Sequence, residues 1–326
     1  MKYFVTGATG FVGGRVARML IADGHQVVAV VRTPAKAQDL AALGVEIHKG
    51  DVTDKASMRA PMTGVDGVFH IAGWYKVGGR DKSEGASINI DGTRNVLELM
   101  QELGIKKGVY TSTLAINSDT HGIVADERYQ FSGQHISEYD RTKAEAHKIA
   151  EQFIANGLPL VILMPGLIYG PGDTSSVRTT LIQVLQGKLP MMPQGTTFSW
   201  AHVDDIARAH IDAMTKGVAG ECYIVAGPTH SFVDAMQIVS EVAGVKTPMA
   251  APAGMFKVLS KVMGVVEKVI PVPDSYSSEG LRVIAGVTYI GKADKAKMTW
   301  GYNPRSLSDG WAETVRHEMN LLSSNN

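Results

Sequence analysis

The sequence predicts an α/β fold: a doubly wound parallel sheet with a smaller C-terminal domain. The chain begins with a short apolar strand that runs into closely spaced glycines, and apolar β-branched runs then alternate with segments of helical periodicity as far as residue 165. Such alternation builds a parallel sheet that binds its ligands at the carboxyl ends of the strands. We therefore expect a first domain over residues 1–165, its sheet completed by 199–226. Residues 166–326 would form mainly the second, substrate-binding domain.

Composition narrows the classes of function. The 326 residues are 44% hydrophobic and 20% charged, carry no net charge and contain no run of lysines or arginines. This balance predicts no nucleic-acid partner and no attraction to an anionic membrane. A single cysteine, Cys222, excludes an internal disulfide, and a strand that starts at residue 2 leaves no room for a signal peptide, so we expect a cytoplasmic protein. The longest apolar run, 158–168, is too short to span a bilayer.

The first strand, residues 2–6, leads into Gly7, Gly10 and Gly13. A strand that passes a diphosphate and enters a helix needs residues without Cβ at the turn, at the closest approach to the ligand and at the helix contact. The helix that follows would direct its N-terminal amides at the diphosphate. We therefore predict nucleotide binding by Gly7, Thr9, Gly10, Phe11, Val12 and Gly13. The alternative is a glycine-rich connection that binds nothing.

The second strand, residues 26–31, is followed by Arg32 and Lys36. At this place an NAD-binding fold usually has an acidic residue, which binds the ribose 2′-hydroxyl. A guanidinium would instead bind a 2′-phosphate through charge-assisted bonds. The position therefore favours NADP(H) over NAD(H), with an arginine that merely ends a strand as the alternative.

Two further strands approach the same edge. After residues 45–49, Asp51 and Val52 are placed to meet the adenine, while Asp54 is expected to cap the helix over 55–60. The strand over 67–71 ends in small residues, so Ile71, Ala72 and Gly73 would approach the cofactor. His70, in this strand, is typical of a core residue. No set of residues in the chain has the spacing of metal ligands, so we predict no metal.

The next helix, expected over 88–103, leads to a strand over 108–111 that brings Thr111 and Thr113 to the edge. Residues 116–138 form a long polar segment, which is a candidate substrate loop. The helix that follows has Tyr139 and Lys143 on one face. A pair with this spacing is common by chance, but its place beside Thr113 indicates chemistry.

The remaining elements follow a looser pattern. A strand over 158–164 ends in a proline- and glycine-rich stretch, 165–172, predicted to be a rigid loop. We expect helices over 180–186 and 232–242, extended segments over 198–203 and 223–226, and a cap at Asp204 or Asp205. A stripe of Met255, Leu259, Val262, Val266 and Val269 is typical of core, with a membrane-surface or partner helix as the alternative.

In these motifs the chain resembles the extended short-chain dehydrogenase/reductase family, also called the NAD-dependent epimerase/dehydratase family. The resemblance rests on residues 6–13, 50–52, 89–96, 112–115, 139–143, 165–172 and 202–205. It implies a Rossmann fold with Tyr139 as general acid/base, Lys143 as its pKa-lowering partner and ribose ligand, Thr113 as the carbonyl-orienting hydroxyl and Asn89 as a supporting residue. It also implies cofactor contacts from Thr111, Tyr139, Lys143, Pro165, Gly166 and Ile168. The chemistry agrees, because a phenol of pKa about 10 needs a nearby positive charge to act as a base at neutral pH.

Departures from the family pattern point to one branch. Thr113 replaces a frequent serine and Met164 a frequent arginine, and residues 196–200 lack the arginine with which nucleotide-sugar enzymes bind a diphosphate. Together with Arg32, this makes the chain look like the dihydroflavonol-reductase and aldehyde-reductase branch. We expect an NADP-dependent carbonyl reductase, a monomer or homodimer, that acts on a small apolar aldehyde or ketone. A nucleotide-sugar epimerase or dehydratase is the first alternative, and a non-catalytic NADP sensor the second.

The substrate pocket is expected to have apolar walls. Aromatic and aliphatic residues that follow strand ends or lie in the long loops are the candidates, with plain packing as the alternative for each: Trp74, Tyr75, Phe131, Leu167, Ile168 and Tyr169. Arg178 is the main objection to the prediction of an uncharged substrate, because this single arginine could bind a substrate phosphate.

Overall fold

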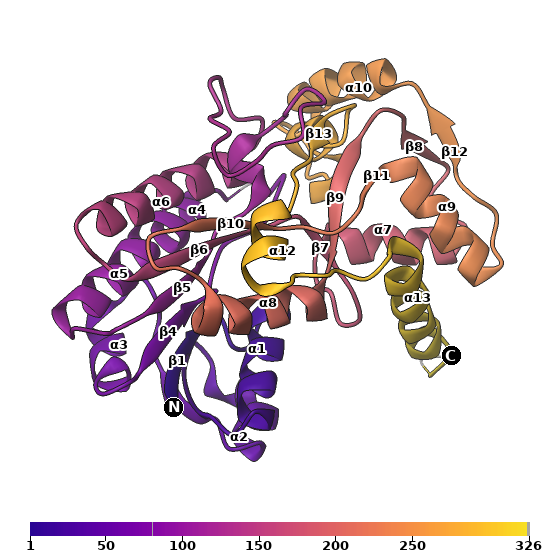
Figure 1. Cartoon of the computed structure of the whole chain (residues 1–326). Coiled ribbons are helices and arrows are strands. Elements are labelled where there is room, and N and C mark those ends of the chain that lie inside the picture. Colours follow the sequence, from indigo (N-terminus) through magenta and orange to yellow (C-terminus); the bar gives the residue numbers. More distant parts are fainter. Residues whose placement is uncertain (80, 325–326) are drawn as a thin grey trace.

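The computed structural model describes residues 1–79 and 81–324. Figure 1 shows a parallel sheet covered by helices, beside a smaller lobe built largely from the second half of the chain. The sheet has seven strands in the order β10-β6-β5-β4-β1-β2-β3, all parallel. These strands are β1 (Lys2–Thr6), β2 (Gln26–Val31), β3 (Glu46–Lys49), β4 (Gly67–His70), β5 (Gly108–Thr111), β6 (Leu160–Pro165) and β10 (Cys222–Val225). The predicted doubly wound fold is confirmed.

The order of the strands places the site. The chain runs outward from β1 through β2 to β3, then returns to the other side of β1 to build β4, β5 and β6. The reversal lies between β1 and β4, and ligands of such sheets bind at the carboxyl ends beside it. The glycines after β1 and Gly73 after β4 therefore meet at this point.

Helices cover both faces of the sheet. Helices α1 (Phe11–Ala22) and α8 (Val203–Lys216) pack together on one face, and α3 (Lys55–Met62), α5 (Gly92–Glu102) and α6 (Glu138–Ala155) cover the other. Neighbouring strand residues point to opposite faces, so Phe4 and Val5 are fully buried in different cores. Burial on both faces explains the near-continuous apolar runs of these strands. Short helices η1 (Pro34–Ala37), α2 (Gln38–Ala42), α4 (Ser83–Ala86) and η3 (Leu114–Asn117) lie in the connections, and a π-helical turn (Ser87–Asp91) precedes α5.

The smaller lobe has its own sheet around β9 (Thr197–His202). Strand β11 (Thr229–Ser231) pairs with β9 antiparallel, whereas β7 (Leu167–Tyr169) and β13 (Thr288–Tyr289) pair with it in parallel. Strands β8 (Met191–Pro193) and β12 (Met249–Ala251) form a separate pair. The lobe's helices are α7 (Ser176–Leu185), α9 (Phe232–Ala243), α10 (Ala253–Val266), η4 (Asp274–Tyr276), α11 (Ser278–Arg282), α12 (Asp294–Trp300) and α13 (Leu307–Ser324). The segment 199–226 is expected to complete the main sheet; its strand β10 does so, whereas β9 belongs to the sheet of the smaller lobe. The domain boundary at residue 165 stays a prediction.

Three local predictions are wrong. The stretch 165–172 contains the strand β7, since its apolar residues pair with β9. The cap of α8 is His202, whose Nδ1 accepts a hydrogen bond from the Asp204 amide at 3.4 Å. Asp204 and Asp205 instead pair with Arg15 and Arg305, at 2.7 and 3.0 Å. The apolar stripe of α10 faces outward rather than into a core.

No helix among the described residues combines the length and apolar character needed to cross a membrane.

Candidate active site

The three glycines after β1 form a tight cradle. Gly7 has a φ of +71°, and a Cβ there would lie 2.8 Å from the Ala72 amide nitrogen. A Cβ on Gly13 would lie 2.2 Å from the Gly7 carbonyl oxygen, and one on Gly10 would lie 3.1 Å from it. Gly10 has no side chain with which to cap α1, so it leaves the first amides of the helix open to a ligand. This geometry fits the diphosphate of a dinucleotide, beside the exposed Thr9 and the partly exposed Phe11 and Val12.

A buried threonine, Thr6, ties this cradle to the end of β4. Its hydroxyl oxygen accepts hydrogen bonds from the amides of Ile71 and Ala72 at 3.0 and 3.1 Å. Its hydrogen is then available to His70 Nδ1, 2.9 Å away. The sequence alone does not reveal this role of Thr6, because it depends on the pairing of β1 with β4.

His70 is a core residue, as expected. Both ring nitrogens have partners, since Nε2 lies 3.0 Å from the Thr93 hydroxyl. Burial, with a smaller contribution from Lys143, lowers the pKa of His70 to about 3, so the ring is neutral at ordinary pH. Thr93 in turn bonds Tyr110, and Tyr110 accepts a bond from Lys143. A chain of buried polar groups thus links the glycine cradle to Lys143.

Arg32 and Lys36 are exposed beyond the end of β2. Within the described part of the chain, neither side chain forms a hydrogen bond or ion pair. Other arginines nearby are engaged: Arg15 with Asp204, and Arg18 with Asp39. The two basic groups after β2 are therefore free to meet an anion.

The acidic groups after β3 have local partners. One oxygen of Asp51 accepts bonds from the Thr53 amide and hydroxyl, both at 2.9 Å. Asp54 caps α3 as predicted, accepting bonds from the amides of Ala56 and Ser57 at 3.1 and 3.4 Å. Val52 is buried against Gly92, where a Cβ would approach it to 2.8 Å. No donor among the described residues bonds the other carboxylate oxygen of Asp51.

Tyr139 lies in the first turn of α6, which Ser137 caps. The Thr113 hydroxyl accepts a bond from the Ala115 amide at 3.1 Å and also forms a hydrogen bond with the Tyr139 phenol. Removal from water raises the pKa of Tyr139 to about 12, although the bond from Thr113 opposes this shift. The structure therefore brings Thr113 and Tyr139 together with the tyrosine in its protonated form.

Lys143 lies one turn further along α6 and is only 5% exposed. Its Nζ donates to the Thr111 carbonyl at 2.8 Å and to the Tyr110 hydroxyl at 3.2 Å, and it stands 4.8 Å from the centre of the Tyr110 ring. Burial lowers the pKa of Lys143 to about 7. The expected lowering of the Tyr139 pKa by Lys143 does not occur in this structure, because the ammonium group is directed at β5 and the dominant effect on the phenol is burial.

Asn89 holds the backbone that follows β4. It lies in the π-helical turn, accepts a bond from the Trp74 amide at 2.8 Å and donates to the Trp74 carbonyl and the Thr142 hydroxyl, both at 3.0 Å. A Cβ on Gly73 would lie 3.4 Å from Asn89 Oδ1 and 3.9 Å from Lys143 Nζ. Gly73 thus keeps the space above Asn89 and Lys143 open.

Asp140, next to Tyr139, was not singled out from the sequence. It is 2% exposed and accepts bonds from Ser118 at 3.0 Å, Ser137 at 2.6 Å and Tyr289 at 3.0 Å. Burial raises its pKa to about 6, while these hydrogen bonds act in the opposite direction. It joins the start of α6 to the loop after η3 and to β13. The Ser-x-x-Asp spacing at a helix start was the available signal.

The residues after β5 and β6 reach the same edge. Thr111 bonds His210 Nε2 at 2.8 Å through its hydroxyl, and Pro165 ends β6. A Cβ on Gly166 would lie 2.1 Å from the Ser199 carbonyl oxygen, so this glycine permits the contact with β9. Ile168 is partly buried in β7, opposite Ala201.

The residues predicted to form the apolar walls of the substrate pocket differ in exposure, and some of them are buried in a core. Tyr75 is 53% exposed and bonds Thr174 at 3.0 Å, and Phe131 packs on His135 with ring centres 4.9 Å apart. Trp74 is buried, and its indole nitrogen has no hydrogen-bond partner in the described part of the chain. Tyr169 stacks on Trp311 at 4.5 Å and belongs to the core of the smaller lobe, as Leu167 does in part. The prediction that Tyr169 lines the substrate pocket is therefore wrong.

Arg178 is already paired. Its Nε and one terminal nitrogen donate to the two oxygens of Glu318 at 2.8 and 2.9 Å, and Glu318 is 1% exposed. This bidentate bond joins α7 to α13. Because Arg178 is paired with Glu318, it is not available to bind a substrate phosphate, which agrees with the prediction of an uncharged substrate.

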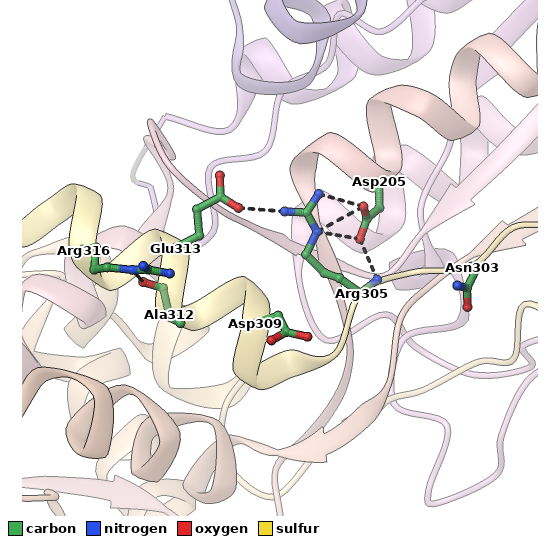
Figure 2. Close-up of a pocket in the computed structure, with 7 residues that line it drawn as sticks. All are labelled: Asp205, Asn303, Arg305, Asp309, Ala312, Glu313 and Arg316. Carbon is green, nitrogen blue, oxygen red and sulfur yellow. Dashed lines mark hydrogen bonds and ion pairs between the residues drawn. The ribbon is translucent and has the colours of Figure 1, made fainter.

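An open hollow of about 560 Å³ lies elsewhere, between the start of α8 and α13. Figure 2 shows Arg305 at its centre, bonded to both oxygens of Asp205 and to Glu313 at 2.8 Å. Arg305 is therefore already paired with carboxylates, and none of the predicted site residues lines the hollow.

The comparisons with known proteins agree with this geometry. The sequence pattern of the NAD-dependent epimerase/dehydratase family matches residues 3–226. A 2-alkyl-3-oxoalkanoate reductase of Stenotrophomonas maltophilia is 32% identical over 83% of this chain and 84% of its own length. Sterol demethylase protein B of Methylococcus capsulatus is 30% identical over 77% of each chain. An anthocyanidin reductase of Vitis vinifera is 29% identical over 73% of this chain and 79% of its own.

Among solved structures, the crystal structure of gox2253 superposes with a TM-score of 0.86 at 29% identity and covers 98% of each chain. The family pattern spans both the glycine cradle and the helix that carries Tyr139. The chain belongs to the NAD-dependent epimerase/dehydratase family of extended short-chain dehydrogenases/reductases and is an NAD(P)-dependent enzyme of that type.

Proposed function

We propose that this protein is an NADP-dependent carbonyl reductase that acts on a small, largely apolar aldehyde or ketone. One observation carries the proposal: a protonated Tyr139, bonded to Thr113, lies one helical turn from a buried Lys143 at the sheet edge where the glycine cradle opens. A proton donor, an orienting hydroxyl and a cation beside a dinucleotide cradle are the groups that carbonyl reduction requires.

The residues divide the work as follows. The amides at the glycine cradle bind the diphosphate. Asn89 fixes the backbone of Trp74 next to Gly73, and Lys143 lies beside it, bonded to the Thr111 carbonyl. The bound nicotinamide supplies the hydride. Thr113 orients the carbonyl oxygen, and Tyr139 donates its proton to that oxygen as it becomes an alcohol. A pKa of about 12 keeps the tyrosine in the donating form.

The preference for NADP(H) depends on Arg32 and Lys36. Both are exposed at the carboxyl end of β2, the strand next to β1, and neither is engaged by another described side chain. An unpaired guanidinium binds a 2′-phosphate with charge-assisted bonds. An acidic group at this place would repel the phosphate.

Two positions considered for a cation that would bind a substrate diphosphate offer none among the described residues, which supports an uncharged substrate. Residues 196–200 contain no basic side chain, and Arg178 is bound to Glu318. A buried diphosphate would need a cation to offset its charge. The names of two relatives, a 2-alkyl-3-oxoalkanoate reductase and an anthocyanidin reductase, also favour the reduction of a small molecule other than a nucleotide sugar.

The test is product analysis with purified protein. We expect NADPH oxidation with hydrophobic aldehydes or ketones, loss of that oxidation in Tyr139→Phe, and no conversion of UDP-, GDP- or dTDP-sugars. If chromatography finds an epimerised or dehydrated nucleotide sugar without net NADPH consumption, the proposal is wrong and the epimerase or dehydratase alternative takes its place.

A further inference from the structure

Helix α10 presents an apolar face to the outside of the molecule. Its large side chains Met255, Val258, Leu259, Val262 and Val265 are between 39% and 67% exposed, and Val269, in the turn that continues the helix, is 81% exposed. These six residues are the α10 face. On the inner side of the helix, Phe256 is buried and Met263 is partly buried. A contiguous exposed apolar surface of this kind marks an interaction site.

The lysines of this helix and of the turn that continues it form a row along one edge of the α10 face. At about 100° per residue, the six apolar side chains cover an arc of about 120°, from Val265 to Leu259. Lys257, Lys261 and Lys268 fall within about 40° of one another, between the apolar arc and the buried side. All three are exposed. The helix is therefore amphipathic in its exposed half, with apolar residues beside cations.

The α10 face is held in a fixed position. The Ser260 hydroxyl donates to the Ser278 carbonyl at 2.7 Å, and the two oxygens of Glu267 accept bonds from the Ser278 amide and hydroxyl at 2.8 and 2.6 Å. Ser278 begins α11, where Glu279 accepts a bond from the Glu138 amide at 3.1 Å, at the start of the helix that carries Tyr139. Figure 1 shows α10 as the outermost helix at the top of the smaller lobe.

We propose that the α10 face docks on the surface of an anionic lipid bilayer. An amphipathic helix with apolar residues on one side and lysines beside them lies in the interface, with its apolar side chains among the acyl chains. The lysine row then reaches the negatively charged headgroups, which its side chains contact while their stems stay on the apolar surface. The attachment is peripheral, because none of the described helices is suited to span the membrane.

Charge distinguishes a bilayer from a second copy of this chain. Residues 253–270 contain a single acidic residue, Glu267, whose carboxylate is bound to Ser278. Pairing of two α10 faces about a two-fold axis would bring two lysine rows together without an acidic partner from either helix. An anionic membrane supplies the negative charge along the whole row. This inference does not depend on the reaction proposed above.

The experiment is vesicle flotation of the full-length protein. One set of vesicles contains phosphatidylcholine and phosphatidylglycerol, and the other contains phosphatidylcholine alone. Val262→Glu with Val265→Glu tests the apolar face, and Lys257→Glu with Lys261→Glu tests the lysine row. The matched controls are Val218→Glu with Met298→Glu, at residues 56% and 81% exposed outside α10, and Lys106→Glu with Lys297→Glu. Thermal melts check that every variant is folded.

We expect the wild-type protein to float with the anionic vesicles and to be released by salt. Each α10 double variant should lower the bound fraction about tenfold or more, while both control pairs bind as the wild type does. Failure of the wild-type protein to bind anionic vesicles at low salt, or equal binding by the α10 variants, overturns the proposal. So does a dimer, detected by sedimentation velocity, that Val262→Glu with Val265→Glu converts to monomer, because a second copy would then cover the face.

Discussion

Lys143 is a buried cation whose ionisation affects stability. Its pKa is about 7 in the folded protein but about 10.4 in an unfolded chain. Between these values the unfolded state binds more protons, so the free energy of unfolding rises with pH, by up to about 1.4 kcal/mol per pH unit from this group. Lys143→Met removes this contribution. Urea unfolding of both proteins between about pH 7 and 10 measures this effect. As the pH rises, the free energy of unfolding of the wild type should increase relative to that of Lys143→Met. If the two proteins show the same dependence on pH, Lys143 is not a buried group that titrates in this range.

Tyr139 is predicted to supply the proton without holding the cofactor in place. Tyr139→Phe should leave NADPH affinity nearly unchanged and lower turnover by about 100-fold or more, the contribution expected of a general acid. Lys143→Met should weaken both. Stopped-flow turnover and calorimetric titration separate the two effects. Near-normal turnover in the phenylalanine variant would mean that another group provides the proton.

Arg32 is predicted to set the choice of cofactor. The wild-type protein should bind NADPH at least about tenfold more tightly than NADH, a difference of about 1.4 kcal/mol. Arg32→Asp should abolish or reverse this preference, because a carboxylate repels the 2′-phosphate and accepts a bond from a 2′-hydroxyl. Calorimetric titration gives both affinities, and equal values in the wild-type protein would rule the assignment out.

Single residues differ in how far the sequence predicts them. Thr113, Tyr139 and Lys143 could be found because strand ends and a four-residue helical spacing are local features. Thr6 and Asp140 were missed, since their partners are 64 and up to 149 positions away. Burial, which depends on the assembled structure, raises the pKa of Tyr139, and the sequence alone does not reveal this effect.

At the scale of elements, the junction of β6 with β9 depends on Gly166. A Cβ there would lie 2.1 Å from a β9 carbonyl, so Gly166→Ala should lower the free energy of unfolding by about 1–3 kcal/mol, as overpacking does. Gly254→Ala in α10 is the matched control. Its Cβ would have no neighbour within 4 Å among the described atoms, so it should be neutral or slightly stabilising. Equal losses in chemical denaturation would show that the contact at Gly166 has no special role.

Elements of the first half were predictable because their pattern is unambiguous. Strands buried on both faces are continuous apolar runs, and the helices between them carry buried residues at helical spacing. The second half was harder for two reasons. Strand β7 has three residues and forms only because β9 lies beside it. The stripe of α10 has the periodicity of a core helix, and only the tertiary structure shows that it faces outward. Likewise, Lys257, Lys261 and Lys268 become a basic row only when the helix forms.

For the whole molecule, the order of strands explains why both lobes are needed. The chain completes six strands of the sheet, builds β7 to β9 of the smaller lobe, and returns to add β10 beside β6. Tyr289 of β13 and Glu279 of α11 then bond the start of α6, so the smaller lobe holds the helix that carries Tyr139. Fold class followed from the sequence, but this return contact did not, because it joins segments far apart in the chain.

The return of the chain to β6 has a consequence for dissection of the protein. All six residues of β6 are buried, and β10 covers one of its hydrogen-bonding sides. A fragment that stops at residue 165 would leave this apolar strand as an open sheet edge, a template for pairing between molecules. We expect such a fragment to aggregate, whereas a fragment that includes β10, ending after residue 226, should aggregate less. Light scattering of the two fragments compares them, and a monomeric, folded 1–165 fragment would show that the first half is an autonomous unit.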